Sequence, residues 1–193
     1  PESATTIAEV LRSEGYATSA FTASGYLRPE YGFVQGFDRF WFANNDPART
    51  LNAAIDWIEG SVGPYFSFVH TYHVHSPHDP EGAARDALVR PYGGDLPESV
   101  HPPDYPWGRR KGPQLDPEDV RYISDLYDAE ILEIDTLLGE MLDRLEAAGK
   151  LENTLIIVTS DHGEEFQDHG HFEHGWSLYE EQLSVPLIVH YPG

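Results

Sequence analysis

Apolar residues recur along the first half of the chain with two periods, and segments of each period alternate. The spacing over 5–15 predicts a helix that a threonine can cap. The looser alternation over 16–22 predicts a short strand. A second helix, with proline in its first turn, is expected over 46–59. The uninterrupted apolar run at 65–69 is typical of a strand that is buried on both faces.

The same alternation continues in the second half. A long helix with one apolar face is expected from about 116 to 148, where Gly149 ends it. Apolar runs at 155–159 and 185–189 predict two more buried strands. Helices that alternate with apolar strands predict an α/β fold, in which helices cover both faces of a mainly parallel sheet in an α/β/α arrangement of three layers.

Two segments do not follow this pattern. Residues 25–45 are rich in turn residues and aromatic rings, which predicts a packed excursion without regular structure. Residues 72–115 carry many prolines, glycines and charges, and we expect a long irregular insertion there. A loop of that length is usually functional or disordered.

The composition sets the size and the broad class of the protein. The chain has 193 residues, of which 40% are hydrophobic, so one substantial core and one domain are expected. No apolar run approaches the ~20 residues that a membrane-spanning helix requires. The first residues lack the basic start and apolar stretch of a signal peptide, and this leaves the compartment open.

The charge excludes one class of partner. The formal net charge is −21, from 33 acidic and 12 basic residues, and such a field repels nucleic acids and anionic membranes. The acidic residues are spread along the chain, which favours an adaptation for solubility over a dedicated cation-attracting surface. The absence of cysteine excludes disulfides, thiolate metal sites and a cysteine nucleophile within these residues.

Polar, ligand-type side chains gather directly after two of the predicted strands. One cluster covers residues 70–78 and the other covers residues 161–174. In open parallel sheets, ligands bind beyond the carboxyl ends of the strands. The two clusters therefore predict a functional site at that edge of the sheet.

Asp161 and His162 are the first candidates within the second cluster. They follow the predicted strand directly, and Gly163 allows the chain to turn so that both side chains face one crevice. A carboxylate beside an imidazole suits a divalent cation with mixed oxygen and nitrogen ligands. In the alternative, Asp161 caps the next segment and His162 is a hydrogen-bonded loop residue. Position alone leaves both interpretations open.

The other histidines have a similar ambiguity. His169, His171 and His174 lack the spacing of a helical zinc site, but imidazoles here can bind an anionic substrate or donate a proton to a leaving group. In an extended segment His73 and His75 share one face and can converge. Each of these histidines can instead be a solvated loop residue. The chain has no phosphate-binding glycine loop, and no residue stands out as a nucleophile.

Four stretches together resemble the sulfatases of the alkaline-phosphatase-like superfamily. The stretch at 153–193, NTLIIVTSDHGEEFQDHGHFEHGWSLYEEQLSVPLIVHYPG, resembles the second signature region of that family and is the most specific. The others resemble the segment after the nucleophile motif, the helix before the metal strand and the substrate-histidine loop: TTIAEVLRSEGYATSAFTA, YDAEILEIDTLLGEMLDRLEAAG and FVHTYHVHSP. The similarity covers most of the chain in the family's order, and 82–114 is its least diagnostic part.

The resemblance implies roles for individual residues. Asp161 and His162 match the second pair of metal ligands, and the metal is usually calcium, with zinc or manganese in related enzymes. His75 matches the histidine that contacts the transferred sulfate or the leaving oxygen. His174 occupies the position of a family lysine, and it can replace that lysine only if it is protonated or donates a hydrogen bond.

Three further histidines complete the expected site. His73, His78 and His169 are expected around it, either behind the ligands or against the substrate.

The family pattern also includes parts that this sequence does not contain. An amino-terminal Asp pair and a Cys- or Ser-x-Pro-x-Arg motif, whose Cys or Ser becomes the formylglycine nucleophile, are absent. We therefore interpret residues 1–193 as a partial, incomplete sulfatase catalytic domain with the insertion at about 72–115. Formylglycine is expected only in the missing segment, and the fragment alone is expected to be inactive.

The predicted function is metal-dependent hydrolysis of a sulfuric ester, with a small-molecule or carbohydrate sulfate ester as the substrate. Two alternatives stay open. One is a phosphodiesterase or phosphonate hydrolase of the same superfamily, because sulfate and phosphate esters require similar anion-binding sites. The other is a noncatalytic cation-binding or structural domain. The sequence predicts neither an oligomeric state nor a location.

Overall fold

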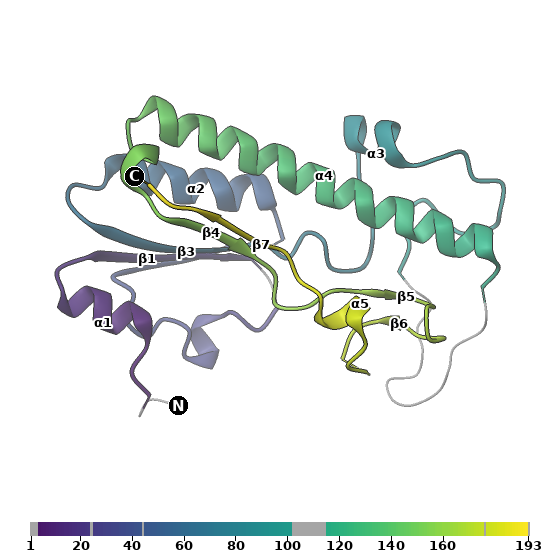
Figure 1. The fold of residues 1–193 in the computed structure, drawn as a ribbon, viewed down its shortest axis with the longest axis horizontal. Helices are drawn as coiled ribbons and strands as arrows, with labels where there is room; N and C mark the ends of the chain where they lie inside the picture. The colour runs from purple at the N-terminus through teal and green to yellow at the C-terminus, as the bar shows by residue number, and fades with distance from the viewer. Residues whose placement is uncertain (1–3, 24, 44, 102–114, 176, 193) are drawn as a thin grey trace. The chain divides into compact units, whose positions relative to one another are not determined.

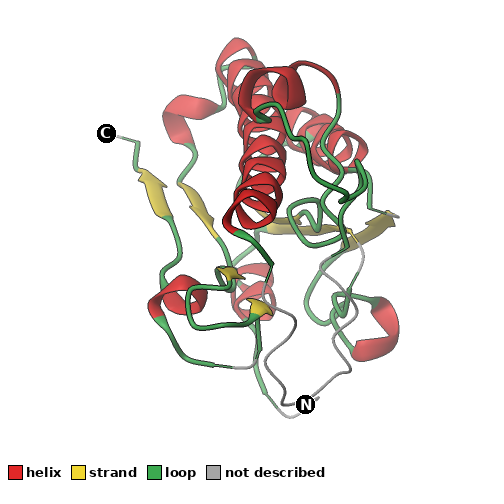
Figure 2. Ribbon diagram, turned by 90° about the vertical axis from the view of Figure 1, so that its right-hand side faces the viewer, coloured by secondary structure: helices red, strands yellow, loops and turns green. Residues whose placement is uncertain are grey.

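A computed structural model describes residues 4–23, 25–43, 45–101, 115–175 and 177–192. Helices, short strands and long loops all occur in it (Figure 2). The stretch 102–114 of the predicted insertion lies outside the described residues.

The chain divides into two compact units. The first comprises residues 1–73 and 134–151, and the second comprises residues 74–133 and 152–193. None of the described helices is long and apolar enough to cross a lipid bilayer.

A parallel three-stranded sheet forms the centre of the first unit, with strand order β2-β1-β3. Helix α1 contacts β1 from one side, and the longer helix α2 packs on the other side of the sheet (Figure 1). This arrangement confirms the predicted α/β/α layering and parallel sheet. The elements are α1 (Ile7–Ser13), β1 (Ala17–Ala23), β2 (Arg39–Ala43), α2 (Pro47–Gly60) and β3 (Tyr65–His70), with a short 3-10 turn at Pro29–Tyr31.

The central strand is the most buried part of this sheet. In β1, Phe21 is fully buried and pairs in register with Trp41 on one side and Val69 on the other. Ile55 of α2 is also buried against the sheet. The core of the unit therefore lies between β1 and α2.

The helix starts follow the cap signals in the sequence. Thr6 and Glu9 form a capping box, in which the Glu9 amide donates to Thr6 Oγ1 at 3.2 Å and the Thr6 amide donates to Glu9 Oε2 at 2.9 Å. Asp46 caps α2 by accepting from the Arg49 amide at 2.9 Å. Both caps satisfy amides that have no partner inside the helix.

Two expectations for this unit were wrong. Strand β2 occupies 39–43, where an irregular excursion was predicted. The strand was not predicted because its sequence, RFWFA, lacks the alternation of apolar and polar residues that marks a strand. Strand β3 is only half-buried and Phe68 is 39% exposed, because β3 lies at the edge of the described sheet.

The second unit combines the first part of the long helix with two antiparallel strand pairs, β4–β7 and β5–β6. Its core cluster consists of five buried residues from the insertion, the helix and β6: Val100, Tyr122, Ile123, Leu126 and Phe172. The elements are α3 (Gly82–Leu88), α4 (Pro117–Ala147, up to residue 133 in this unit), a 3-10 turn at Leu151–Asn153 that straddles the unit boundary, β4 (Ile156–Thr159), β5 (Glu165–Phe166), β6 (Phe172–Glu173), α5 (Glu180–Leu183) and β7 (Leu187–His190).

The structure also corrects expectations for this unit. The insertion predicted as irregular contains α3 and a backbone bridge between His78 and Val100. The strands predicted as buried have exposed side chains, with Ile157 58% and Leu187 70% exposed. Strand β7 begins after Pro186, which has no amide hydrogen to donate to a strand partner.

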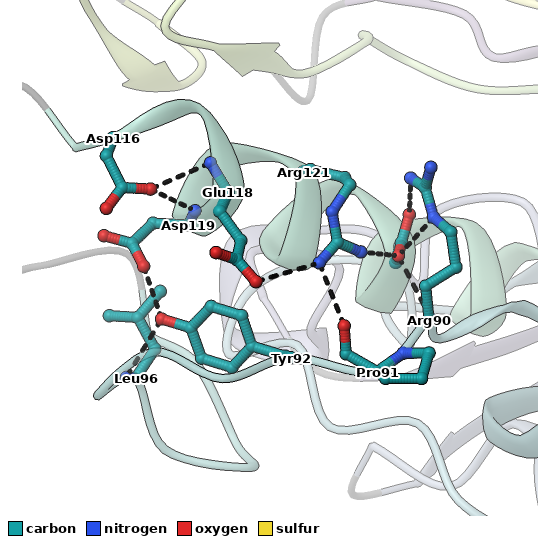
Figure 3. Close-up of polar contacts among 9 residues, drawn as sticks. Arg90, Pro91, Tyr92, Leu96, Asp116, Glu118, Asp119 and Arg121 are labelled. Atoms are coloured by element: carbon teal, nitrogen blue, oxygen red, sulfur yellow. Dashed lines mark hydrogen bonds and ion pairs between the residues drawn. The ribbon is translucent and has the colours of Figure 1, made fainter.

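A group of charged residues attaches the insertion to α4. Arg90 and Arg121 both donate to the buried carboxylate of Asp125, and the Tyr92 hydroxyl donates to Asp119 (Figure 3). Burial pushes the pKa of Asp125 upward, but the hydrogen bonds from Arg90 outweigh this effect and hold the pKa below its ordinary value. The ionised carboxylate therefore stabilises the folded insertion.

Candidate active site

Three histidines from the two polar segments lie together in the second unit. The rings of His162 and His174 stack with their centroids 3.6 Å apart. The ring of His75 meets His174 edge-on, with centroids 5.0 Å apart and planes at 80°. The structure thus brings one predicted substrate histidine, His75, to the other, His174, across 99 positions of sequence.

The loop between β5 and β6 is organised by a buried carboxylate, Glu165. Its Oε1 accepts from the amides of His169 at 2.9 Å and His171 at 3.1 Å, and its Oε2 accepts from Gln182 at 3.2 Å. Buried carboxylates need such donors to offset the loss of water. Sequence reasoning missed Glu165, because a glutamate within a polar run looks like a solvated residue.

Gly163 fixes the position of Asp161 and His162 relative to α5. Its amide donates to the Gln182 carbonyl at 2.8 Å, and a Cβ at this position would lie 2.1 Å from the Glu181 carbonyl oxygen. Only glycine allows so close an approach of two backbones. The glycine predicted as a turn residue is therefore required here for backbone packing.

Asp161 and His162 form a donor pair that suits a divalent cation. His162 Nδ1 lies 2.8 Å from the Gly163 carbonyl oxygen, which can only accept, so Nδ1 carries the hydrogen. The lone pair of the neutral ring is then on Nε2, which lies 3.8 Å from Asp161 Oδ1. Metal-binding histidines commonly donate their other ring N–H to a backbone carbonyl in this way.

The pair does not form a complete metal centre by itself. Within the described ranges, no group of three or more His, Asp or Glu side chains is arranged to hold a metal ion. The Asp161 side chain is 83% exposed, so its oxygens are accessible. The donor chemistry fits a cation, and further ligands are needed to complete its coordination.

His174 is paired with Glu164. Its Nδ1 lies 3.3 Å and 3.4 Å from the two oxygens of Glu164, whose side chain is 5% exposed. The hydrogen bond to Glu164 raises the pKa of His174, against the opposing effect of burial. This pairing favours the protonated imidazole, which is the form that binds an anion. Sequence reasoning did not identify Glu164.

His75 is held by backbone and side-chain contacts on its own segment. Its Nδ1 lies 2.9 Å from the Ser76 carbonyl oxygen, so Nδ1–H donates to that carbonyl. The hydroxyl of Ser76 donates in turn to Glu173 Oε1 at 3.0 Å. The segment that carries His75 is therefore attached to β6, next to His174.

The other predicted histidines lie outside the group of three rings. His78 is fully buried, with Nδ1 2.7 Å from Glu130 Oε2. His169 stacks on Tyr179 with centroids 3.6 Å apart, and its Nε2 lies 3.4 Å from a Glu181 carboxylate oxygen. His73 belongs to the first unit.

Comparison with known proteins shows the family to which the chain belongs. The chain matches the Sulfatase family over residues 1–193. It belongs to the sulfatase family. The fold inferred from the sequence resemblance is thereby confirmed, since solved structures share the same architecture.

Similarity to individual sulfatases is moderate. The chain is 36% identical over 110 residues to arylsulfatase K from Bos taurus, an alignment that covers 56% of this chain and 20% of the bovine protein. It is 42% identical over 72 residues to N-acetylglucosamine-6-O-sulfatase from Bacteroides thetaiotaomicron, which covers 37% of this chain and 12% of that protein. The aligned region therefore spans a fifth or less of either curated relative.

A solved structure extends the fold comparison to nearly the whole chain. A protein determined with its substrate D-glucosamine-2-N,6-O-disulfate superposes with a TM-score of 0.70 and 19% sequence identity. The match covers 98% of this chain and 56% of that chain. At this level of identity the superposition shows the shared fold alone.

Proposed function

We propose that this sulfatase chain supplies the substrate histidines and half of the metal site of a sulfuric-ester hydrolase. The observation that carries the proposal is the contact of His75, His162 and His174 beside Asp161. Cationic and hydrogen-bond-donating imidazoles next to a cation-binding carboxylate provide the charges that an anionic sulfate group requires.

Asp161 and His162 would hold the divalent cation. Calcium is proposed because it is the usual metal of the family, and zinc or manganese are the alternatives; the carboxylate oxygens of Asp161 suit all three, whereas the Nε2 lone pair suits zinc better than calcium. When bound, such a cation neutralises charge on the sulfate oxygens and polarises the ester.

The two remaining histidines have separate tasks. His174, whose protonated form is favoured by Glu164, binds a sulfate oxygen in the place of the family lysine. His75, oriented by its hydrogen bond to the Ser76 carbonyl, contacts the leaving oxygen. The sequence contains no cysteine, so a formylglycine made from cysteine must come from a segment outside these 193 residues.

The substrate class we propose is a carbohydrate sulfate ester. Two similar proteins support this class: one is named for N-acetylglucosamine 6-O-sulfate, and the other was solved with a glucosamine disulfate as its substrate. A sulfated sugar also presents the compact anionic group that two imidazoles and a cation can enclose.

Turnover tests the proposal directly. In a protein that includes the complete family domain, His174→Ala should lower kcat for a glucosamine 6-sulfate by about 100- to 1,000-fold, the usual cost of losing one oxyanion donor. His190→Ala, on exposed β7, is the matched control and should keep full activity. Full activity of His174→Ala would contradict the proposal.

The same assay separates the alternatives. Preference for phosphonate or phosphate esters over sulfates would replace sulfate hydrolysis with the phosphoester alternative. The 193-residue chain by itself should show no turnover, and measurable sulfatase activity of that chain would contradict the assignment of the nucleophile to another segment.

A further inference from the structure

A second histidine–carboxylate pair lies in the core of the second unit, apart from the proposed chemistry. The side chains of His78 and Glu130 are 1% and 2% exposed, and His78 Nδ1 lies 2.7 Å from Glu130 Oε2. The rings of Tyr127 and Phe166 flank the imidazole, with centroids 5.6 Å and 6.3 Å away. In the described part of the chain, His78 Nε2 has no hydrogen-bond partner.

The carboxylate of Glu130 contacts two successive residues of the histidine segment. Besides His78, it accepts a hydrogen bond from the Asp79 amide through Oε1 at 2.9 Å. Both of its oxygens therefore connect α4 to residues 78 and 79. The backbone of His78 is bonded on its other side to Val100, with N–O distances of 2.9 Å in both directions.

Stability alone does not explain a buried pair at this position. Burying a carboxylate is costly, and replacing a buried pair with well-packed apolar residues is often neutral or stabilising. The better-supported use of such a pair is to fix one arrangement of the segments that it joins. Here the joined segments are α4 and residues 75–79.

A second carboxylate holds the other end of the same short segment. Ser76 Oγ donates to Glu173 Oε1 at 3.0 Å, and the Ser76 carbonyl accepts from His75. Only Pro77 separates the two attachment points, and its ring restricts the backbone. Attachment at residues 76 and 78 therefore leaves His75 little freedom to turn away from His174.

We propose that Glu130 is a positioning residue, which holds His75 against His174 by fixing His78 and Asp79 to helix α4. The catalytic meaning of this role rests on the proposed function. The positional claim concerns only the two rings and does not depend on turnover.

Nuclear magnetic resonance of histidine-labelled chain tests the positional claim. The ring protons of His75 and His174 should give a cross-relaxation signal in the wild type, and Glu130→Ala should abolish it. Glu130→Gln should restore it in part, because an amide oxygen can still accept from the Asp79 amide. Glu133→Gln is the matched control, since Glu133 lies on the same helix and accepts from the Glu81 amide at 2.7 Å in an exposed contact. It should leave the signal unchanged.

The outcomes distinguish a positioning role from a general structural one. A folded Glu130→Ala chain with the wild-type signal between the two rings would overturn the proposal. If Glu130→Ala does not fold, Glu130→Gln decides: His75 ring resonances should shift while those of His169, stacked on Tyr179, stay in place. Unchanged His75 resonances would overturn it. Because no substrate is present, failure of sulfate hydrolysis has no bearing on this result.

Discussion

The pairs His78–Glu130 and His174–Glu164 contain the same chemical groups in different surroundings. In the first pair both side chains are at most 2% exposed and the two atoms are 2.7 Å apart. In the second, the His174 side chain is 25% exposed and the distance is 3.3 Å. The first pair is closed to any ligand, whereas the second leaves an imidazole accessible beside His75 and His162. This difference in burial supports our proposal of a structural role for the first pair and a chemical role for the second.

The largest effect on stability is expected from breaking the buried pair. Glu130→Ala leaves His78 without its carboxylate in the core and should lower the free energy of unfolding by about 3–5 kcal/mol. Urea denaturation measures this change. Glu133→Gln, with an exposed contact on the same helix, should stay within about 0.5 kcal/mol of wild type. An equal loss of unfolding free energy in Glu130→Ala and Glu133→Gln would contradict the claim that the buried contact contributes more than the exposed one.

A smaller effect is expected from the carboxylate that attaches the insertion. Asp125→Asn weakens the hydrogen bonds from Arg90 and Arg121 and should lower the free energy of unfolding by about 1–3 kcal/mol. The folded-state pKa of Asp125 is lowered, so its contribution is present above the unfolded pKa and is lost as pH falls through the folded one. The difference between variant and wild type should therefore shrink in acid. A difference that grows in acid would contradict this account.

The accessible pair should respond in its titration more than in its stability. Glu164→Gln removes the carboxylate that raises the pKa of His174, so that pKa should fall towards its ordinary value in a histidine titration by nuclear magnetic resonance. The raised pKa stabilises the fold below the unfolded pKa, and this contribution is lost as pH rises through the folded pKa. Stability should change by less than in Glu130→Ala. An unchanged pKa of His174 would show that Glu164 does not control its protonation.

Elements with a local sequence signal could be predicted, whereas elements that depend on tertiary contacts could not. Periodicity and caps predicted β1, α2 and α4, because each of these elements carries its own local signal. Strand β2 was missed because its RFWFA run has no alternation, and its place beside β1 depends on tertiary pairing.

Local sequence patterns do not indicate which residues of the site contact one another. The positions of His75 and His174 after predicted strands predicted a site, but both lie in histidine-rich runs, and the run of His75 also contains the buried His78. Glu130 and Glu164 look like ordinary acidic residues of a helix and a loop. Only the fold shows which histidine each of them contacts and whether water can reach the pair.

Metal titration of the chain, followed by histidine resonances, tests the central claim most directly. Calcium, with manganese and zinc in parallel, should perturb His162 and its stacked neighbour His174 while His78 remains unchanged, and Asp161→Ala should abolish the perturbation. Perturbation of His78 instead, or an identical response in Asp161→Ala, would contradict the assignment of Asp161 and His162 as half of a metal site beside the substrate histidines.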